Sequence, residues 1–211
     1  MDKNLKEVRF YDFRKENREF APHLAEEGSR KVEGYAIVFN QQSRQLYDKA
    51  SKKVFTETID PRAVTKMFLD EQDIKMLYNH SNDMLLARST FGGGTLAYEI
   101  DDYGVKYSFE MPNTTVGNDV LELIRRGDVW GCSFAFTYAK DGVRDEKRNN
   151  QNFRTVIQMA SIDDFSIVVD PAYLGTYVCT REFSAPDEQN EEKSAHLDID
   201  IAMLELEFEN L

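Results

Sequence analysis

Three short polar motifs interrupt apolar stretches of this 211-residue sequence. Asn79-His80 follows the first stretch, Gly131-Cys132-Ser133-Phe134 lies inside the second, and Asp163-Asp164-Phe165-Ser166 lies inside the third. An imidazole, a hydroxyl and a carboxylate make up an activated serine nucleophile, because the histidine takes the serine proton and the acid orients the histidine. The residue types therefore predict a serine protease, with one candidate catalytic residue in each motif.

In the second motif, Ser133 is a better candidate nucleophile than its neighbour Cys132. Side chains alternate across a strand, so Cys132 shares a face with bulky aromatic residues, whereas Ser133 shares a face with Gly131 and Ala135. We expect Cys132 to point into the core and a substrate backbone to approach Ser133. Alternatively, a serine between small residues only marks a place where another segment packs closely.

His80 is the histidine that directly follows an apolar strand. His23 lies in a charged N-terminal stretch and His196 in an acidic tail. The ordinary pKa of an imidazole lets it accept a serine proton near neutral pH, so His80 is the candidate base. The structural alternative is a histidine that caps a turn formed with residues 81–83.

The candidate acid is Asp164, with Asp163 kept open. In the apolar segment 162–168, alternation places Asp164 on one face with Ser166 and Asp163 on the other face with Phe165. A buried acid is costly unless it is paired, so one of the two aspartates needs a partner, and an imidazole N–H is suitable. Asp163 remains possible if the strand begins later, and either aspartate could instead cap backbone groups.

Alternating apolar residues and turn signals predict many short strands with few helices. Strands are expected near residues 8–10 and over 32–39, 54–59, 74–78, 85–88, 96–100, 105–111, 129–138 and 155–169. Helices are expected over 60–69 and 116–126, capped by Asp60 and by Thr114 or Thr115, and 140–152 is expected to be a charged loop. This order predicts a β-rich α+β fold, a closed or partly open barrel or a sandwich of mostly antiparallel strands with peripheral helices.

The chain divides into three parts by composition. Residues 1–30 form an N-terminal extension with one strand, 31–181 form the main domain, and 182–211 form an acidic linker followed by an amphipathic segment. Leu197, Ile201, Leu204, Phe208 and Leu211 recur at helical spacing, although alternation over 197–201 also permits a strand. We favour a C-terminal helix.

Charge and cysteine content exclude several classes of protein. The net charge is −12, and residues 182–211 contribute −9 of it through ten acids and one base. An acidic surplus argues against nucleic-acid binding, and no apolar segment approaches the length of a leader or a membrane span. Cys132 and Cys179 lack metal-ligand spacing, so we expect buried thiols, no metal and no cofactor in a soluble, non-secreted protein.

A series of motifs over residues 31–181 resembles one known family through its order and spacing. The motifs are Gly34-Tyr35-Ala36 with Val38-Phe39; Phe55 to Ile59 with Asp60-Pro61-Arg62-Ala63; Asn79-His80 with Leu86-Ala87-Arg88; Leu123-Ile124-Arg125-Arg126-Gly127 with Gly131-Cys132-Ser133-Phe134; and Asp164-Phe165-Ser166-Ile167-Val168 with Pro171-Ala172-Tyr173. Together they resemble the prohead (capsid maturation) serine proteases of tailed bacteriophages, which are related in fold to the herpesvirus assemblin proteases.

The resemblance implies roles for the three candidate residues. The family's Asn-His motif falls on His80 and the serine of its Gly-x-Ser motif on Ser133. Its acid is usually a glutamate, and here the position is Asp164, one methylene shorter, which keeps the base-orienting role. Herpesvirus relatives use a second histidine instead. The residue before Arg88 is Ala87 where the family often has glycine. Backbone N–H groups near glycines 92–94 or Gly131 are the candidate oxyanion donors.

The family implies a herpesvirus-protease-like barrel and a serine endopeptidase of phage prohead maturation. Its expected substrates are the scaffold or delta segment of the major capsid protein and the protease itself, inside the assembling prohead in the bacterial host cytoplasm. A portal contact and a homo-oligomer are further expectations, and the acidic tail would bind capsid or scaffold and be removed by self-cleavage. The alternatives are a non-catalytic scaffold or assembly protein with this fold and an esterase, which the missing Gly-x-Ser-x-Gly elbow disfavours.

Overall fold

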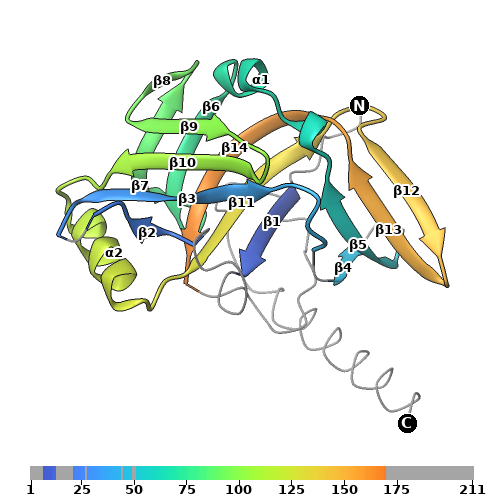
Figure 1. The fold of residues 1–211 in the computed structure, drawn as a ribbon, viewed down its shortest axis with the longest axis horizontal. Helices are drawn as coiled ribbons and strands as arrows, with labels where there is room; N and C mark the ends of the chain where they lie inside the picture. The colour runs from blue at the N-terminus through green and yellow to red at the C-terminus, as the bar shows by residue number, and fades with distance from the viewer. Residues whose placement is uncertain (1–6, 13–20, 27, 44, 49–50, 170–211) are drawn as a thin grey trace, which may run out of the picture. The chain divides into compact units, whose positions relative to one another are not determined.

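The structure is a computed structural model that describes residues 7–12, 21–26, 28–43, 45–48 and 51–169. Its strands and helices are drawn in Figure 1. The strands are β1 (Glu7–Asp12), β2 (His23–Leu24), β3 (Lys31–Val38), β4 (Gln45–Asp48), β5 (Lys53–Ile59), β6 (Asp73–Tyr78), β7 (Ser81–Thr90), β8 (Gly93–Gly94), β9 (Leu96–Ile100), β10 (Gly104–Glu110), β11 (Gly131–Tyr138), β12 (Val143–Arg148), β13 (Gln151–Val156) and β14 (Met159–Val168). The helices are the 3₁₀ turn Pro61–Ala63, α1 (Lys66–Asp70) and α2 (Thr115–Arg126).

The largest sheet has the order β1-β11-β14-β6-β7-β8. Its centre is β14, which pairs antiparallel with β11 on one side and parallel with β6 on the other. β6 and β7 form a hairpin, and β1 pairs with β11 at the opposite end of the sheet. The three polar motifs therefore belong to neighbouring strands, although more than 80 residues separate the first motif from the third.

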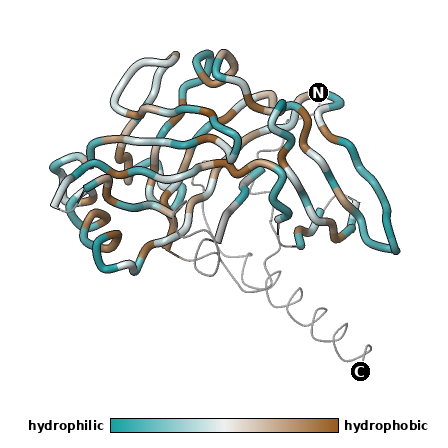
Figure 2. Tube along the Cα trace, viewed as in Figure 1, coloured by the Kyte–Doolittle hydropathy of each residue, from teal (hydrophilic) through white to brown (hydrophobic). Residues whose placement is uncertain are grey.

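Two four-stranded sheets complete the described fold, with the orders β2-β3-β10-β9 and β12-β13-β5-β4. Both are antiparallel except for the parallel pair β13–β5. The hairpin β12–β13 is largely hydrophilic, in contrast to the apolar strands in the middle of the molecule (Figure 2). Most strand pairs are antiparallel, as expected from the sequence, and the fold is β-rich with few helices.

The core consists of apolar side chains from all three sheets and from α2. Its largest fully buried residues include Tyr107, Phe134, Phe136 and Phe165. Removing aromatic side chains of this size from water contributes about 2–3 kcal/mol each. Strands also approach closely where side chains are absent: a Cβ at Gly104 would lie 1.9 Å from the backbone oxygen of Ile37.

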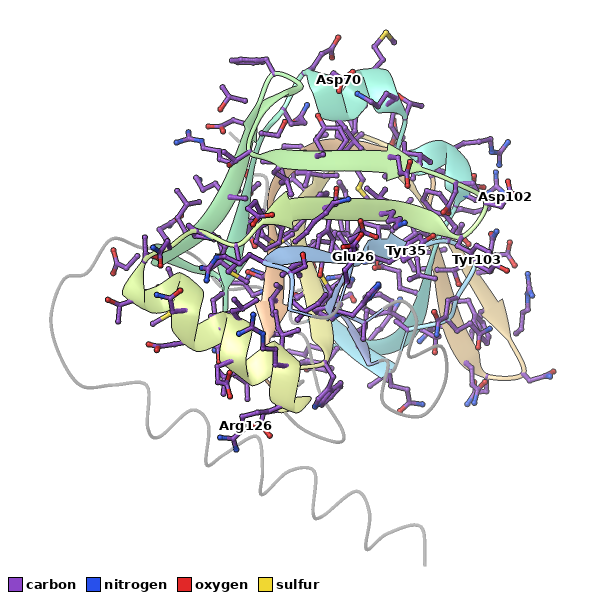
Figure 3. The ribbon with its side chains drawn as sticks, turned by 60° about the vertical axis from the view of Figure 1, so that its left-hand side comes forward. Glu26, Tyr35, Asp70, Asp102, Tyr103 and Arg126 are labelled. Atoms are coloured by element: carbon purple, nitrogen blue, oxygen red, sulfur yellow. The ribbon has the colours of Figure 1, made fainter. Side chains whose placement is uncertain are left out.

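The helices begin and end at residues of the expected types. The Thr114 hydroxyl accepts from the Gly117 amide (3.0 Å) at the start of α2, and Gly127, with φ of 75°, ends it. In Figure 3, Arg126 marks that C-terminal end. Figure 3 also shows Asp70 on α1, where its carboxylate accepts from the hydroxyl of Tyr98 at 3.0 Å and so ties α1 to β9.

The single helix expected over 60–69 is wrong, because the segment forms two separate turns. Asp60 caps the 3₁₀ turn by accepting from the Arg62 amide at 2.9 Å, as its position before Pro61 suggested. The chain then extends at Val64, and Thr65 caps α1 as a second N-cap. The β-branched residues Val64 and Thr65 favour this extended link.

The predictions for residues 140–169 also need correction. A single strand over 155–169 is wrong, since the chain breaks at residues 157–158 between β13 and β14 and the two strands belong to different sheets. The charged loop over 140–152 contains β12, whose side chains are mostly exposed, so that apolar alternation could not reveal it. The turn of glycines 92–94 contains the two-residue strand β8.

No closed barrel forms among the strands that the structure describes, because each of the three sheets has a linear strand order. The closed-barrel form of the expected fold is therefore wrong for this part of the chain. The linker, the C-terminal helix expected within 182–211 and Cys179 lie outside the described residues.

Candidate active site

The candidate base lies in a two-residue hairpin turn between β6 and β7. Tyr78 pairs with Ser81, and both residues between them have positive φ, 52° for Asn79 and 56° for His80. This backbone is what a type I′ turn requires, and asparagine tolerates it better than most residues. The sequence motif Asn-His is therefore the turn itself.

Hydrogen bonds to β14 fix the orientation of this turn. The Asn79 amide donates to the Ile167 carbonyl (2.9 Å), and the His80 amide donates to the Ser166 hydroxyl (2.9 Å). The Asn79 side chain accepts from the Val169 amide at 3.2 Å. These contacts stabilise a left-handed conformation that costs about 1–2 kcal/mol for a residue with a Cβ, and they direct the imidazole over the sheet.

The other two candidates belong to β11 and β14, which run side by side as an antiparallel pair (Figure 1). Ser133 is directly opposite Ser166, and opposite residues of antiparallel strands point to the same side. Asp164 is two residues before Ser166 on the same strand, so it shares that side. The sheet thus places the hydroxyl and the carboxylate on the face that carries His80.

The three side chains lie in series within hydrogen-bond distance of one another. His80 Nδ1 is 2.6 Å from Asp164 Oδ1, and His80 Nε2 is 2.7 Å from Ser133 Oγ. Asp164 is only 3% exposed, whereas the imidazole is 23% exposed. An ionised carboxylate so buried interacts strongly with an N–H donor, which holds the proton on Nδ1 and leaves Nε2 free to accept.

The neighbouring residues have other surroundings. Cys132 is fully buried, and burial raises the pKa of its thiol to about 12, so it stays protonated and unreactive near neutral pH. Asp163 is half-buried, and the carboxylate in contact with His80 belongs to Asp164. Glycines 92–94 lie at the β8 end of the sheet, four strands from β11 and so about 19 Å away. They are too distant to stabilise an oxyanion at Ser133.

One contact at the site involves a residue that the sequence analysis did not single out. Ser133 Oγ donates to the backbone carbonyl of Arg9 on β1 at 2.7 Å, and Ser133 is only 2% exposed. The arginine is itself buried and paired with Glu57 on β5. The alternation around Val8 and Phe10 predicted a strand, but nothing local in the sequence indicated its partner.

None of the helices in the described part of the chain has the length and apolar character of a membrane span. That part of the chain also contains no group of three or more His, Cys, Asp or Glu side chains arranged to hold a metal ion.

Comparison with known proteins identifies a family. A family model described as caudovirus prohead serine protease matches residues 16–190, which is most of the chain and includes all three candidate residues. Comparisons with curated proteins and with solved structures gave no match. On the strength of the family match, the chain belongs to the caudovirus prohead serine proteases.

Proposed function

We propose that the chain is a serine endopeptidase in which Ser133 is the nucleophile, His80 the general base and acid, and Asp164 the residue that orients His80. The observation that carries this proposal is the pair of contacts on one imidazole, 2.6 Å to Asp164 and 2.7 Å to Ser133. Nucleophile, base and orienting acid within hydrogen-bond reach are the geometric signature of this chemistry.

The reaction follows from these positions. Ser133 Oγ attacks the carbonyl carbon of a peptide bond while its proton moves to His80 Nε2. The C–N bond then breaks, and the imidazolium gives that proton to the leaving amine. Water attacks the acyl-enzyme, His80 takes a proton from the water, and the returned proton restores Ser133 as the acid product leaves. Asp164 keeps its charge throughout and stabilises the imidazolium.

We place this activity in phage capsid maturation. The chain belongs to a family of prohead proteases. The finer proposal is that it cleaves the scaffold or delta segment of the major capsid protein, and also itself, inside the assembling prohead. The same proposal includes a portal contact, a homo-oligomer and a herpesvirus-protease-like, partly open barrel. The barrel is supported by the β-rich fold, in which the candidate side chains lie on strands and on a hairpin.

Co-expression with the cognate capsid protein tests the catalytic proposal. We expect Ser133→Ala to abolish processing of both proteins, whereas Cys132→Ala, a matched change one residue away on the opposite strand face, preserves it. Unchanged processing with Ser133→Ala would reject the assignment and favour a non-catalytic assembly protein.

Self-processing of the acidic tail has a separate test. Residues 182–211 carry ten acids and one base, a composition suited to a solvated linker and a docking segment. Mass spectrometry of purified wild-type and Ser133→Ala protein compares their C-termini. A shorter C-terminus in the wild type alone is expected; identical C-termini would rule out self-removal.

A further inference from the structure

β1 occupies the edge of the strand that carries the candidate nucleophile. It pairs antiparallel with β11 along its whole length, with Phe10 opposite Ser133, and it is the terminal strand of its sheet. If β1 were displaced, the N–H and C=O groups along β11 would be available to another extended segment. Strand addition to such an edge is a general way of binding a peptide.

The side chain of Arg9 fills a charged, buried pocket between two sheets. Arg9 is 4% exposed and Glu57, on β5, is 2% exposed. Arg9 Nη2 donates to Glu57 Oε2 at 2.9 Å while Arg9 Nε donates to Glu57 Oε1, so the contact is bidentate. The guanidinium carbon lies 5.3 Å from the centre of the Phe136 ring.

Tyr138, at the end of β11, completes this pocket. Its hydroxyl donates to Glu57 Oε2 at 2.6 Å and accepts from Arg9 Nη2. A buried carboxylate held by a tyrosine and flanked by an aromatic ring matches a planar guanidinium better than a lysine ammonium, which cannot make the bidentate contact. The shape and charge of the pocket therefore suit an arginine.

The family match covers the β11 edge and the Glu57 pocket but not β1, the strand that occupies them. The family match begins at residue 16, beyond the end of β1 at Asp12, but it includes Glu57, Ser133 and Tyr138. The match thus covers β11 and the pocket residues and does not extend over β1.

The hydrogen bonds of Ser133 indicate that β1 is an occupant and not a substrate in the act of cleavage. Ser133 Oγ lies 2.7 Å from both the Arg9 carbonyl oxygen and His80 Nε2. A hydroxyl has one proton and a carbonyl oxygen only accepts, so a proton given to Arg9 is withheld from His80. In this arrangement the serine meets the carbonyl at its oxygen and is not activated.

We propose that the β11 edge, with Glu57 and Tyr138, is the substrate site of the enzyme, occupied in this structure by the chain's own β1. It binds an extended peptide whose arginine enters the Glu57 pocket and supplies the carbonyl that Ser133 attacks. This inference rests on the proposed serine endopeptidase activity and adds its substrate class.

Cleavage of a randomised library of extended peptides by the full-length wild-type chain tests the specificity. We expect arginine at the new C-terminus of the products, well above lysine and neutral residues. For two matched peptides with arginine or glutamine at that position, we compare kcat/KM for the arginine peptide with kcat/KM for the glutamine peptide. Glu57→Gln should lower this arginine-to-glutamine ratio by about 10- to 100-fold. Glu146→Gln, a change at an exposed glutamate on β12, should leave the ratio unchanged.

Two results would overturn this inference: products without an arginine preference, or a ratio that Glu57→Gln leaves as it is. If Glu57→Gln does not fold, Tyr138→Phe removes the hydroxyl that holds Glu57 and should lower the same ratio. The comparison between the two peptides on the wild-type chain requires no protein variant at all.

A binding measurement separates this inference from the proposed activity. The probe is a fluorescent peptide with the sequence of residues 5–14, read by anisotropy against the full chain carrying Ser133→Ala and Arg9→Gln. We expect this peptide to bind about tenfold more tightly than the same peptide with glutamine in place of Arg9 alone. It should also bind more tightly to this double variant than to Ser133→Ala alone, in which the chain's own β1 still competes for the edge. Arginine-dependent binding together with no cleavage by the wild-type chain would uphold the pocket and reject the activity. Cleavage by the wild-type chain that does not depend on arginine would uphold the activity and reject the pocket. Absence of arginine-dependent binding would reject the pocket.

Discussion

Replacing Asp164 by asparagine tests the proposed orienting role most directly. Asparagine has nearly the same shape, but its amide can donate to His80 Nδ1 across the present 2.6 Å contact. The imidazole proton would then move to Nε2, which could no longer accept the proton of Ser133. From the size of this tautomer effect in serine proteases, we expect processing to slow by about 10³- to 10⁴-fold, or about 4–5.5 kcal/mol of transition-state stabilisation.

Two further substitutions determine whether the loss comes from the tautomer or from disturbed packing. Asp164→Glu keeps the charge but inserts a methylene at a position that is only 3% exposed. It should cost about 1–3 kcal/mol of folding stability through overpacking and, by displacing the imidazole, slow processing by up to about 100-fold. Asp163→Asn makes the same chemical change one residue away, on the opposite face of β14, and should leave the rate within about threefold of wild type.

The assay is a time course of capsid-protein processing during co-expression. The expression level of each variant is adjusted so that its rate remains measurable. Thermal unfolding of the purified variants checks that each is folded. The expected order is wild type and Asp163→Asn together, then Asp164→Glu, then Asp164→Asn. An Asp164→Asn rate within tenfold of wild type, or an equal loss with Asp163→Asn, would refute the assignment of Asp164.

Three predictions concern the framework around the site and are tested by urea or thermal unfolding. Asn79→Ala should destabilise the protein by about 1–2 kcal/mol because alanine resists the positive φ, whereas Asn79→Gly should cost less; equal losses would contradict the argument. Gly104→Ala should cost about 3 kcal/mol, since its Cβ would lie 1.9 Å from the Ile37 oxygen, and a neutral result would show that the strands can separate there. The hydrogen bond from Arg62 lowers the pKa of Asp60 from 3.8 to about 2, so its stabilisation is present above pH 4 and is lost as the pH falls towards 2. Asp60→Asn should remove that part of the pH dependence, by less than about 1 kcal/mol because Arg62 is exposed, and an unchanged acid profile would count against it.

Local sequence pattern predicted the faces of the site strands because side chains alternate strictly wherever a strand is regular. From Gly131 to Ala135, β11 pairs with β14 in continuous register, and the shifts come only after Ala135. Counting alternate residues along the sequence therefore placed Ser133 and Cys132 on different faces of their strand, and Asp164 and Ser166 on the same face of theirs. The structure has these residues on those faces. Turn chemistry was equally local, since Asn79-His80 needs no distant partner to form a turn.

Features that depend on distant partners were not predictable from such patterns. The parallel pairing of β14 with β6 joins segments more than 80 residues apart, and nothing in either strand encodes it. β12 is held by its pairing with β13 and carries charged residues on both sides. The buried pair of Arg9 and Glu57 could not be inferred either, because each residue alone suggests an exposed position.

The central position of β14 has a consequence for the time at which the proposed active site can form. β14 is the last strand of the described chain, yet it lies between β11 and β6. Neighbouring strands are about 4.8 Å apart, so β11 and β6 are held at twice that spacing only when β14 has been inserted. A growing polypeptide that has emerged as far as residue 150 contains both Ser133 and His80 but has no strand to hold them in register. On the proposed mechanism, the three side chains can therefore be brought together only after β14 has left the ribosome.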